Sequence, residues 1–313
     1  MNEAYAIIGA GTLGLAVARQ LATAGVQARL VSRSGRAEAP VGIDVLAADL
    51  SDPAAARQAC HGTSVVFHCA SGPYASWPTA LPPIMAGIIE GAAANSAKIV
   101  YGDNLYSYGP VSGPLTEDLP YRPVGPNTRV RAQLATELME AHASGRVRAT
   151  IGRASDFYGP HANLSTVGDS VFARALDGKA AQVLGDPDAP HTYTFIDDFA
   201  RALVTLAQLD EALGQVWHVP SAETLTTRRF IEMVFEQVGA PARIQRPPSA
   251  VLALLGIFNP TIRAVNEVRY QSQHPWLVDH SKYTRAFGGS TTPHHDAIGK
   301  TLEWFRQASA SRS

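Results

Sequence analysis

The sequence predicts an α/β fold, a doubly wound parallel sheet with a smaller C-terminal capping lobe. Short apolar runs typical of buried strands alternate with longer stretches of helical periodicity through the first two-thirds of the chain. A glycine-rich turn joins the first strand directly to the first helix, as parallel sheets of this kind commonly begin. After about residue 160 the alternation gives way to loops rich in proline and glycine, which indicate the lobe.

The strands and helices follow one another in a regular order. We expect strands at Ala4–Ile8, Gln27–Arg33, Ile43–Ala47, Ser64–Cys69, Lys98–Tyr101 and Val147–Ile151. Helical patterns cover Pro53–Ala59, Leu81–Ala94 and Val130–Ala143, and Asp296–Arg306 indicates a closing amphipathic helix. Because ligands of such sheets bind beyond the carboxyl ends of the strands, functional residues should directly follow these strands.

The turn after the first strand has the spacing of a dinucleotide-binding motif. Gly9 permits the tight turn, Gly11 lets backbone N–H groups approach a pyrophosphate, and Gly14 allows the helix to pack closely on the strand. Thr12 and Leu13 open the helix, whose N-terminus carries the positive end of the helix dipole. This context predicts a dinucleotide site, and a turn that has lost its ligand is the alternative.

The end of the second strand indicates which dinucleotide is bound. An Asp or Glu would hold the ribose hydroxyls of NAD there, and the sequence has none. Ser32, Arg33 and Arg36 instead offer a hydroxyl and two cations suited to a 2′-phosphate. We therefore expect NADP, with NAD as second choice. A solvated loop is the alternative interpretation of the two arginines.

Composition limits the remaining possibilities. The 313 residues are 46% hydrophobic with a formal net charge of −1, so the chain lacks the basic excess of a nucleic-acid-binding protein. No apolar run approaches the length of a membrane span, and we expect a cytoplasmic protein. Cys60 and Cys69 fall in predicted buried segments and indicate reduced thiols. His294-His295 is best explained by a surface turn, so we expect no metal site.

Further motifs follow the later strands in order. They are Asp49-Leu50, the run from His68 to Ser71, Tyr108-Gly109-Pro110, Arg153 to Pro160, the helix start Phe195 to Ala200 and the strand Trp217 to Ser221. Together with the glycine turn, this set resembles the extended-type short-chain dehydrogenase/reductases, the NAD(P)-dependent epimerase/dehydratase family. The resemblance spans roughly residues 4 to 235. It implies a Rossmann sheet in which Asp49 and Leu50 contact the adenine, and Cys69, Ala70 and Ser71 line the cofactor.

The catalytic motif of that family is missing. Members usually have a Ser or Thr five residues before the Gly of Tyr-Gly, and a Tyr-x-x-x-Lys pair on the next helix. Here Asn104 stands at the Ser position, and no tyrosine in the chain has a lysine four residues later. Aligning the helix on Glu137 puts Arg129 and Gln133 at the Tyr and Lys positions. We interpret both as exposed helix residues, since neither can serve as an acid at neutral pH.

The segment after the fifth strand could replace the missing pair. Tyr106 or Tyr108 could donate a proton, Asp103 could act as base or orient the donor, and the Asn104 amide could polarise a carbonyl. The alternative is structural: Tyr108 packs the corner after the strand, and Asp103 binds backbone groups in a turn.

Candidate substrate contacts follow the fourth and sixth strands. Tyr74 and Trp77 follow the fourth strand, and Ser155, Asp156 and Tyr158 follow the sixth. His191 occupies a position where relatives have a substrate contact, often an arginine near a nucleotide diphosphate. The replacement of that arginine by histidine argues against a nucleotide-sugar substrate. The aromatic residues favour a small molecule with a hydrophobic or ring face.

Three functions remain open. The first is an NADP-dependent oxidoreductase acting on a small carbonyl or alcohol, with a non-standard proton donor from residues 103–108. A sugar epimerase or dehydratase and a non-catalytic NADP-binding regulatory protein are the alternatives. We expect a dinucleotide-binding domain over residues 1–160, to which residues 192–220 return, and a substrate-binding lobe over residues 161–191 and 221–313. The apolar helices Leu81–Ala94 and Val130–Ala143 leave both a monomer and a homodimer open.

Overall fold

A seven-stranded parallel sheet forms the centre of the structure, a computed structural model that describes residues 4–247 and 257–310. Its order is β3, β2, β1, β4, β5, β6, β11. The strands are β1 (Ala4–Ile8), β2 (Ala28–Ser32), β3 (Ile43–Ala47), β4 (Thr63–His68), β5 (Lys98–Asp103), β6 (Arg148–Arg153) and β11 (Val216–His218). The strand order reverses between β1 and β4, which is where such sheets bind ligands. The predicted α/β fold is confirmed.

Strands β5 and β6 extend two residues further than the sequence pattern predicts. The prediction ended at Tyr101 and Ile151, where polar residues begin, whereas the strands continue to Asp103 and Arg153. These two residues stand opposite each other in the register of the two strands. Because their opposite charges pair, the strands continue into polar residues without leaving either charge uncompensated.

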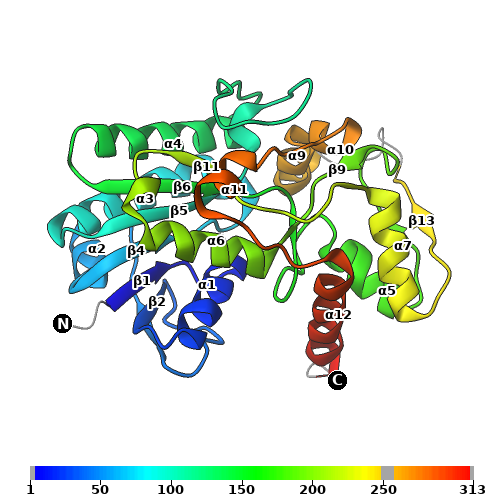
Figure 1. Cartoon of the computed structure of the whole chain (residues 1–313), viewed down its shortest axis with the longest axis horizontal. Coiled ribbons are helices and arrows are strands. Elements are labelled where there is room, and N and C mark those ends of the chain that lie inside the picture. Colours follow the sequence, from blue (N-terminus) through cyan, green and yellow to red (C-terminus); the bar gives the residue numbers. More distant parts are fainter. Residues whose placement is uncertain (1–3, 248–256, 311–313) are drawn as a thin grey trace.

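Helices cover both faces of the sheet (Figure 1). One face carries α1 (Thr12–Thr23), α6 (Ile196–Gln208) and α11 (Ser281–Phe287), and the other carries α2 (Pro53–Ala59), α3 (Trp77–Ala94) and α4 (Pro126–Ala143). Apolar residues such as Leu21 and Leu203 fill the first layer, and Met85 and Leu138 fill the second. Both α3 and α4 begin four residues before the predicted start, because a proline near the first turn of each is compatible with a helix.

A smaller lobe packs beside the sheet, around α7 (Thr227–Val238) and α12 (His294–Ala310), the latter drawn in red in Figure 1. Its core contains Phe172, Phe230 and Phe305. The lobe also contains η3 (Gly168–Ala173), α5 (Arg174–Leu176), α9 (Pro260–Glu267) and α10 (Tyr270–Gln273). Its short strands form three pairs: β7 (Phe157–Tyr158) with β10 (Thr194–Phe195), β8 (Ala181–Gln182) with β13 (Ile244–Gln245), and β9 (Pro190–His191) with β12 (Leu225–Thr226). The 3₁₀ turns η1 (Tyr74–Ser76), η2 (Tyr106–Tyr108) and η4 (Asp210–Ala212) lie nearer the sheet.

The chain passes between the sheet and the lobe more than once. Helix α6 and strand β11, from residues 192–220, belong to the sheet, and α11 packs on β11 through Tyr283 and Trp217. The domain boundaries given above stay a prediction. None of the helices in the described ranges is both long and apolar enough to span a bilayer.

Two glycines set how closely α1 lies on the sheet. Gly9 has a φ of +106°, and a Cβ there would lie 2.7 Å from the backbone of Ala70. A Cβ on Gly14 would lie 1.8 Å from the carbonyl oxygen of Gly9. The first and third glycines of the motif are therefore required by the fold itself, whether or not a ligand is bound.

We expect Gly14→Ala to destabilise the protein by about 2 kcal/mol or more, because α1 must move away from β1 to admit the methyl group. Gly11→Ala should cost at most about 1 kcal/mol, because nothing lies within 4 Å of the added Cβ. Urea denaturation of both variants measures this difference, and equal losses of stability would contradict it.

Candidate functional site

The N-terminus of α1 is open to an anion. Gly11 is its N-cap residue, so no side chain caps the helix, and the first turn contains no acidic residue. Gly11 is exposed and faces open space, while Leu13 is buried against the sheet. The Thr12 hydroxyl donates to the carbonyl of His161, 2.7 Å away in the lobe. Unsatisfied N–H groups at a helix start, with room beside them, fit the pyrophosphate of a dinucleotide.

Two free cations follow β2. Arg33 and Arg36 are exposed, and neither guanidinium forms an ion pair within residues 4–247 or 257–310. The Ser32 hydroxyl contacts the Arg36 carbonyl at 3.4 Å, which shapes the loop. These groups fit a 2′-phosphate in charge and position.

The residues that follow β3 and β4 form the rest of the predicted cofactor site. Asp49 accepts hydrogen bonds from the N–H and hydroxyl of Ser51, which hold the pKa of its carboxyl below the usual value. Leu50 is buried, and Ser71 is exposed. Cys69 is buried, and its N–H donates to the Ile8 carbonyl at 2.9 Å, which brings Ala70 against Gly9. The structure therefore brings the predicted cofactor residues together at the ends of β1 to β4.

Neither cysteine is in a disulfide. Cys60 and Cys69 are both buried and unpaired, and burial raises the pKa of both thiols. Within the described ranges, no three His, Cys, Asp or Glu side chains gather as ligands for a metal ion.

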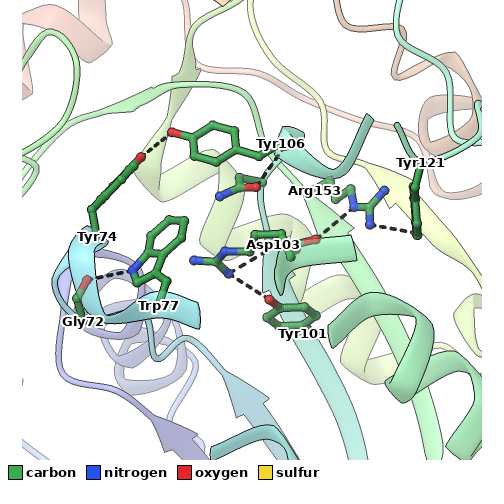
Figure 2. A network of polar contacts seen from close by, with 10 residues as sticks. Gly72, Tyr74, Trp77, Tyr101, Asp103, Tyr106, Tyr121 and Arg153 are labelled. Atoms are coloured by element: carbon green, nitrogen blue, oxygen red, sulfur yellow. Dashed lines mark hydrogen bonds and ion pairs between the residues drawn. The ribbon is translucent and has the colours of Figure 1, made fainter. Parts of the chain in front are cut away.

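Asp103 lies at the end of β5 in a buried charge network (Figure 2). Its Oδ1 is 3.4 Å from Arg131 Nη1, and its Oδ2 is 3.1 Å from Arg153 Nε. The arginines also donate to the hydroxyls of Tyr101 and Tyr121, each at 2.8 Å. Both oxygens of Asp103 thus face arginines, and its side chain is fully buried. This environment fits a structural role better than the predicted role of base.

Tyr108 has no exposed surface either. Its hydroxyl lies 2.9 Å from His218 Nε2, and the Arg153 guanidinium lies 4.8 Å from the centre of its ring. Burial raises the pKa of the phenol to about 12. The structural alternative, in which Tyr108 packs the corner after β5, therefore describes its position.

Of the four predicted catalytic residues, Asn104 and Tyr106 have hydrogen-bonding groups that remain available. Asn104 is half-buried, and its side-chain oxygen accepts from the Tyr106 N–H at 3.0 Å, which leaves the amide N–H groups available. The Tyr106 hydroxyl forms a hydrogen bond with the Tyr74 hydroxyl. In such a pair one hydroxyl donates to the other, so the second keeps its proton for another acceptor.

Trp77 packs against the Tyr74 member of this phenol pair. Its ring stacks on Tyr74 with 4.2 Å between the centroids, and its Nε1–H donates to the Gly72 carbonyl at 3.0 Å. Figure 2 shows Tyr74, Trp77 and Tyr106 on one side of the charge network. Burial raises the pKa of Tyr74 to about 12, and it also raises the pKa of Tyr106 well above its usual value.

Two residues of α4 that the sequence analysis did not select face this site. Arg129 and Gln133 are exposed, in line with their interpretation above. The residues two positions before each of them, Asn127 and Arg131, are buried instead. The Asn127 amide donates to the Tyr74 carbonyl at 3.1 Å. The Arg131 guanidinium lies 4.0 Å from the centre of the Trp77 ring. The alignment on Glu137 therefore selected the wrong face of the helix. A signal was available, because Arg131 is the single cation among the apolar residues of that helix face.

The start of α4 depends on the lobe. Gly125 precedes the helix and provides no capping side chain. The Glu267 carboxylate, at the end of α9, accepts from the N–H groups of Asn127 and Thr128 at 3.2 and 2.7 Å. A negative charge at a helix N-terminus is stabilising. Helix α9 thus caps the helix that carries Asn127 and Arg131.

The predicted substrate residues of the lobe separate into two groups. Ser155 and His191 are buried near Asp156, and His191 Nε2 lies 3.1 Å from Asp156 Oδ2. Tyr158 instead packs between aromatic rings of the lobe core, and its hydroxyl bonds to His294 Nδ1 at 2.9 Å. The structure therefore places Tyr158 away from a substrate, because β7 turns its side chain into the core.

Comparison with known proteins agrees with this geometry. A model of the NAD dependent epimerase/dehydratase family matches residues 6–219. The 2-alkyl-3-oxoalkanoate reductase of Shewanella oneidensis is 25% identical over 276 residues, 82% of this chain and 71% of the relative. A dTDP-glucose 4,6-dehydratase of Streptomyces venezuelae, solved with NAD bound, has a TM-score of 0.80 at 16% identity, with 98% of each chain covered. A UDP-N-acetylglucosamine 4-epimerase of Methanobrevibacter ruminantium has a TM-score of 0.81 at 16% identity, covering 98% of this chain and 99% of that one.

We expect Asp103→Asn to cost about 3 kcal/mol or more of folding free energy, because it leaves two buried arginines without a counter-charge. The matched control is Asp188→Asn, whose pair with Arg228 is exposed and should contribute at most about 1 kcal/mol. Denaturant titration of both variants tests the difference, and a small loss in Asp103→Asn would show that the network is not needed for stability.

Proposed function

Because the chain belongs to the NAD dependent epimerase/dehydratase family, we propose that it is an NADP-dependent oxidoreductase that interconverts a small carbonyl compound and its alcohol. The observation that carries this proposal is the hydroxyl pair of Tyr74 and Tyr106, which leaves one hydroxyl proton free for another acceptor, while the Tyr106 N–H holds the Asn104 side chain in the same turn. The pair supplies an acid in a site that has no Tyr-x-x-x-Lys motif.

The cofactor site supports NADP over NAD. Arg33 and Arg36 are unpaired at the end of β2, where a carboxylate would be needed to hold ribose hydroxyls. Gly11 and the open start of α1 would hold the pyrophosphate, and Cys69, Ala70 and Leu50 would line the rest. When bound, the nicotinamide supplies or accepts the hydride. The Streptomyces dehydratase was solved with NAD, so the preference has to be tested on this chain.

The protein's own groups would handle the proton. In reduction, the Asn104 amide donates a hydrogen bond to the substrate carbonyl, and the free hydroxyl of the Tyr74–Tyr106 pair transfers its proton to the carbonyl oxygen. The resulting phenolate shares the remaining proton of the pair and recovers one from water, because Tyr74 is only partly buried. In oxidation the same proton moves in the opposite direction.

Arg131 provides the positive charge that a lysine provides in relatives. Its guanidinium is fixed over Trp77, and its charge lowers the pKa of both Tyr74 and Tyr106 against the larger effect of burial. It therefore stabilises the phenolate without touching it. This role explains why an arginine is buried at this point of α4, beside residues that could otherwise form an apolar face.

The two other functions remain as alternatives. An epimerase or dehydratase must begin by oxidising a sugar hydroxyl, whereas the raised pKa of both phenols keeps them protonated at neutral pH and so favours the reductive direction. A non-catalytic NADP-binding protein has no need of a phenol pair with a transferable proton. The name of the Shewanella relative, a reductase, also supports the first function.

NADPH should bind at least about tenfold more tightly than NADH, because the 2′-phosphate pairs with a guanidinium. Arg33→Ala should remove most of this preference, whereas the control Arg57→Ala, exposed on α2, should retain it. Calorimetric titration of the unmodified protein and both variants with each nucleotide gives the six dissociation constants. Tighter binding of NADH to the unmodified protein would contradict the assignment.

Tyr106→Phe should lower kcat for carbonyl reduction by about 10²-fold or more, because the remaining Tyr74 hydroxyl loses the partner that shares the negative charge after proton transfer. NADPH affinity should stay the same, which separates a lost acid from a lost fold. Tyr283→Phe, on α11 and remote from the site, is the matched control. Steady-state NADPH oxidation measures both, and full activity in Tyr106→Phe would show that the proton comes from another group.

A further inference from the structure

Asp156 is a carboxylate at the junction of the sheet and the lobe. It follows β6, and its backbone carbonyl accepts from the Thr194 N–H at 3.0 Å, which fixes it to the lobe. Its side chain is 14% exposed and lies 3.1 Å from His191 Nε2. Among the described residues His191 Nε2 has no hydrogen-bond partner, so its contact with the Asp156 carboxylate is not a hydrogen bond.

Several phenols surround this carboxylate. Burial is the main reason that the pKa values of Tyr74, Tyr106, Tyr193 and Tyr270 are raised, and the negative charge of Asp156 raises all four further. Asp156 therefore lies within electrostatic reach of the proposed acid pair. Tyr270 connects the two places, because its ring centroid lies 5.7 Å from that of Trp276 and its hydroxyl lies 3.5 Å from the Tyr106 carbonyl oxygen.

The phenols do not use Asp156 as an acceptor. Tyr193 bonds to the Thr227 hydroxyl at 2.9 Å, Tyr270 points to the Tyr106 carbonyl at 3.5 Å, and Tyr74 bonds to Tyr106. An ionised carboxylate has about four positions for donors. In residues 4–247 and 257–310, no side chain donates a hydrogen bond to Asp156, which is unusual for so enclosed a charge.

Buried donors beside Asp156 are also without partners. The Ser155 hydroxyl and the Trp276 indole N–H belong to residues that are 6% and 2% exposed, and neither has a hydrogen-bond partner in the described structure. Trp276 pairs with His191 through the backbone and packs against Tyr270. Ser155 is the sequence neighbour of Asp156, and the backbone of Trp276 pairs with that of His191, which contacts Asp156, so both unsatisfied donors lie on segments that adjoin the carboxylate. Buried polar groups of this kind are normally completed by a ligand or by water.

We propose that Asp156, with Ser155 and Trp276 beside it, binds a hydroxyl group of the substrate, so that the enzyme selects neutral hydroxylated ketones and their diols. This inference rests on the proposed function and names the substrate class of the same site. The substrate hydroxyl donates to Asp156 and accepts from Ser155 or Trp276. Its carbonyl then meets the Tyr74–Tyr106 pair.

The surrounding charges favour a neutral substrate. A carboxylate would face Asp156, and Arg131, whose charge reaches the phenol pair, is already paired with Asp103. An ammonium group would meet the positive charge of Arg131, which reaches both Tyr74 and Tyr106. A hydroxyl satisfies the unpaired groups and adds no charge. In this respect the chain differs from a reductase of oxo acids.

The test uses three ketones of matched shape: 4-hydroxy-2-butanone, 2-pentanone and 3-oxobutanoate. With NADPH, kcat/KM should be at least about tenfold higher for the hydroxyketone than for either of the others. The matching binding series, in the presence of NADP, is 1,3-butanediol, 2-pentanol, 3-hydroxybutanoate and 4-amino-2-butanol. Dissociation constants from tryptophan fluorescence, which Trp77 and Trp276 report, should follow the same order, with the diol tightest.

Asp156→Asn should bring the hydroxyketone-to-ketone ratio close to one, because the amide is a weaker acceptor and cannot replace the charge. Asp169→Asn is the control: it removes an exposed carboxylate from the same lobe and should keep the ratio. If Asp156→Asn fails to fold, the two ligand series on the unmodified protein still decide the matter.

The outcomes separate this inference from the proposed function. Diol preference without turnover of any ketone would keep the hydroxyl site and overturn the oxidoreductase assignment. Turnover of all three ketones at similar kcat/KM, or a preference for 3-oxobutanoate, would overturn the hydroxyl site and keep the oxidoreductase. Tightest binding of 4-amino-2-butanol would show that Asp156 selects a cation, which also overturns the inference.

Discussion

The ion pairs of Asp103 with Arg131 and Arg153 are the interaction on which the rest of the site depends. One buried carboxylate joins β5, β6 and α4, and its two arginines carry one more positive charge than it can neutralise. Burying charges is expensive unless their geometry is fixed, so the network holds the strand ends and the helix in one arrangement. The excess charge is available to the phenols next to it. Stability and the proposed chemistry therefore depend on the same three residues.

The two halves of the site are built in different ways. The cofactor side consists of short local segments at the ends of β1 to β4, where each turn is determined by neighbouring residues such as Gly9 and Gly14. The substrate side gathers Tyr74, Tyr106, Asp156 and His191 from four separate parts of the chain. It forms only when the lobe packs against the sheet. This difference explains why the first half has a recognisable sequence motif and the second has none.

The sequence was sufficient to predict the sheet and the positions of its strands, because these follow from periodicity and from one turn. It was insufficient wherever the decisive contact is distant in sequence. Nothing local to Asp103 reveals two arginines 28 and 50 residues away, and the face of α4 that meets the site follows from packing on Trp77. Tyr158 was assigned to the substrate for the same reason. Its neighbours in the sequence do not show that the lobe core encloses it.

The cap that Glu267 places on α4 makes a helix in the middle of the chain depend on a segment that follows it by more than a hundred residues. As the protein is synthesised, the glycine turn and the first six strands leave the ribosome well before residue 267. Helix α4 then lacks the carboxylate that satisfies its first N–H groups, and Asn127 and Arg131 lie in its first two turns. A growing chain can thus form the cofactor side of the site early, whereas the proposed substrate side forms only after α9 has been synthesised. Premature termination before α9 would yield a protein that retains the nucleotide site and lacks an ordered place for chemistry.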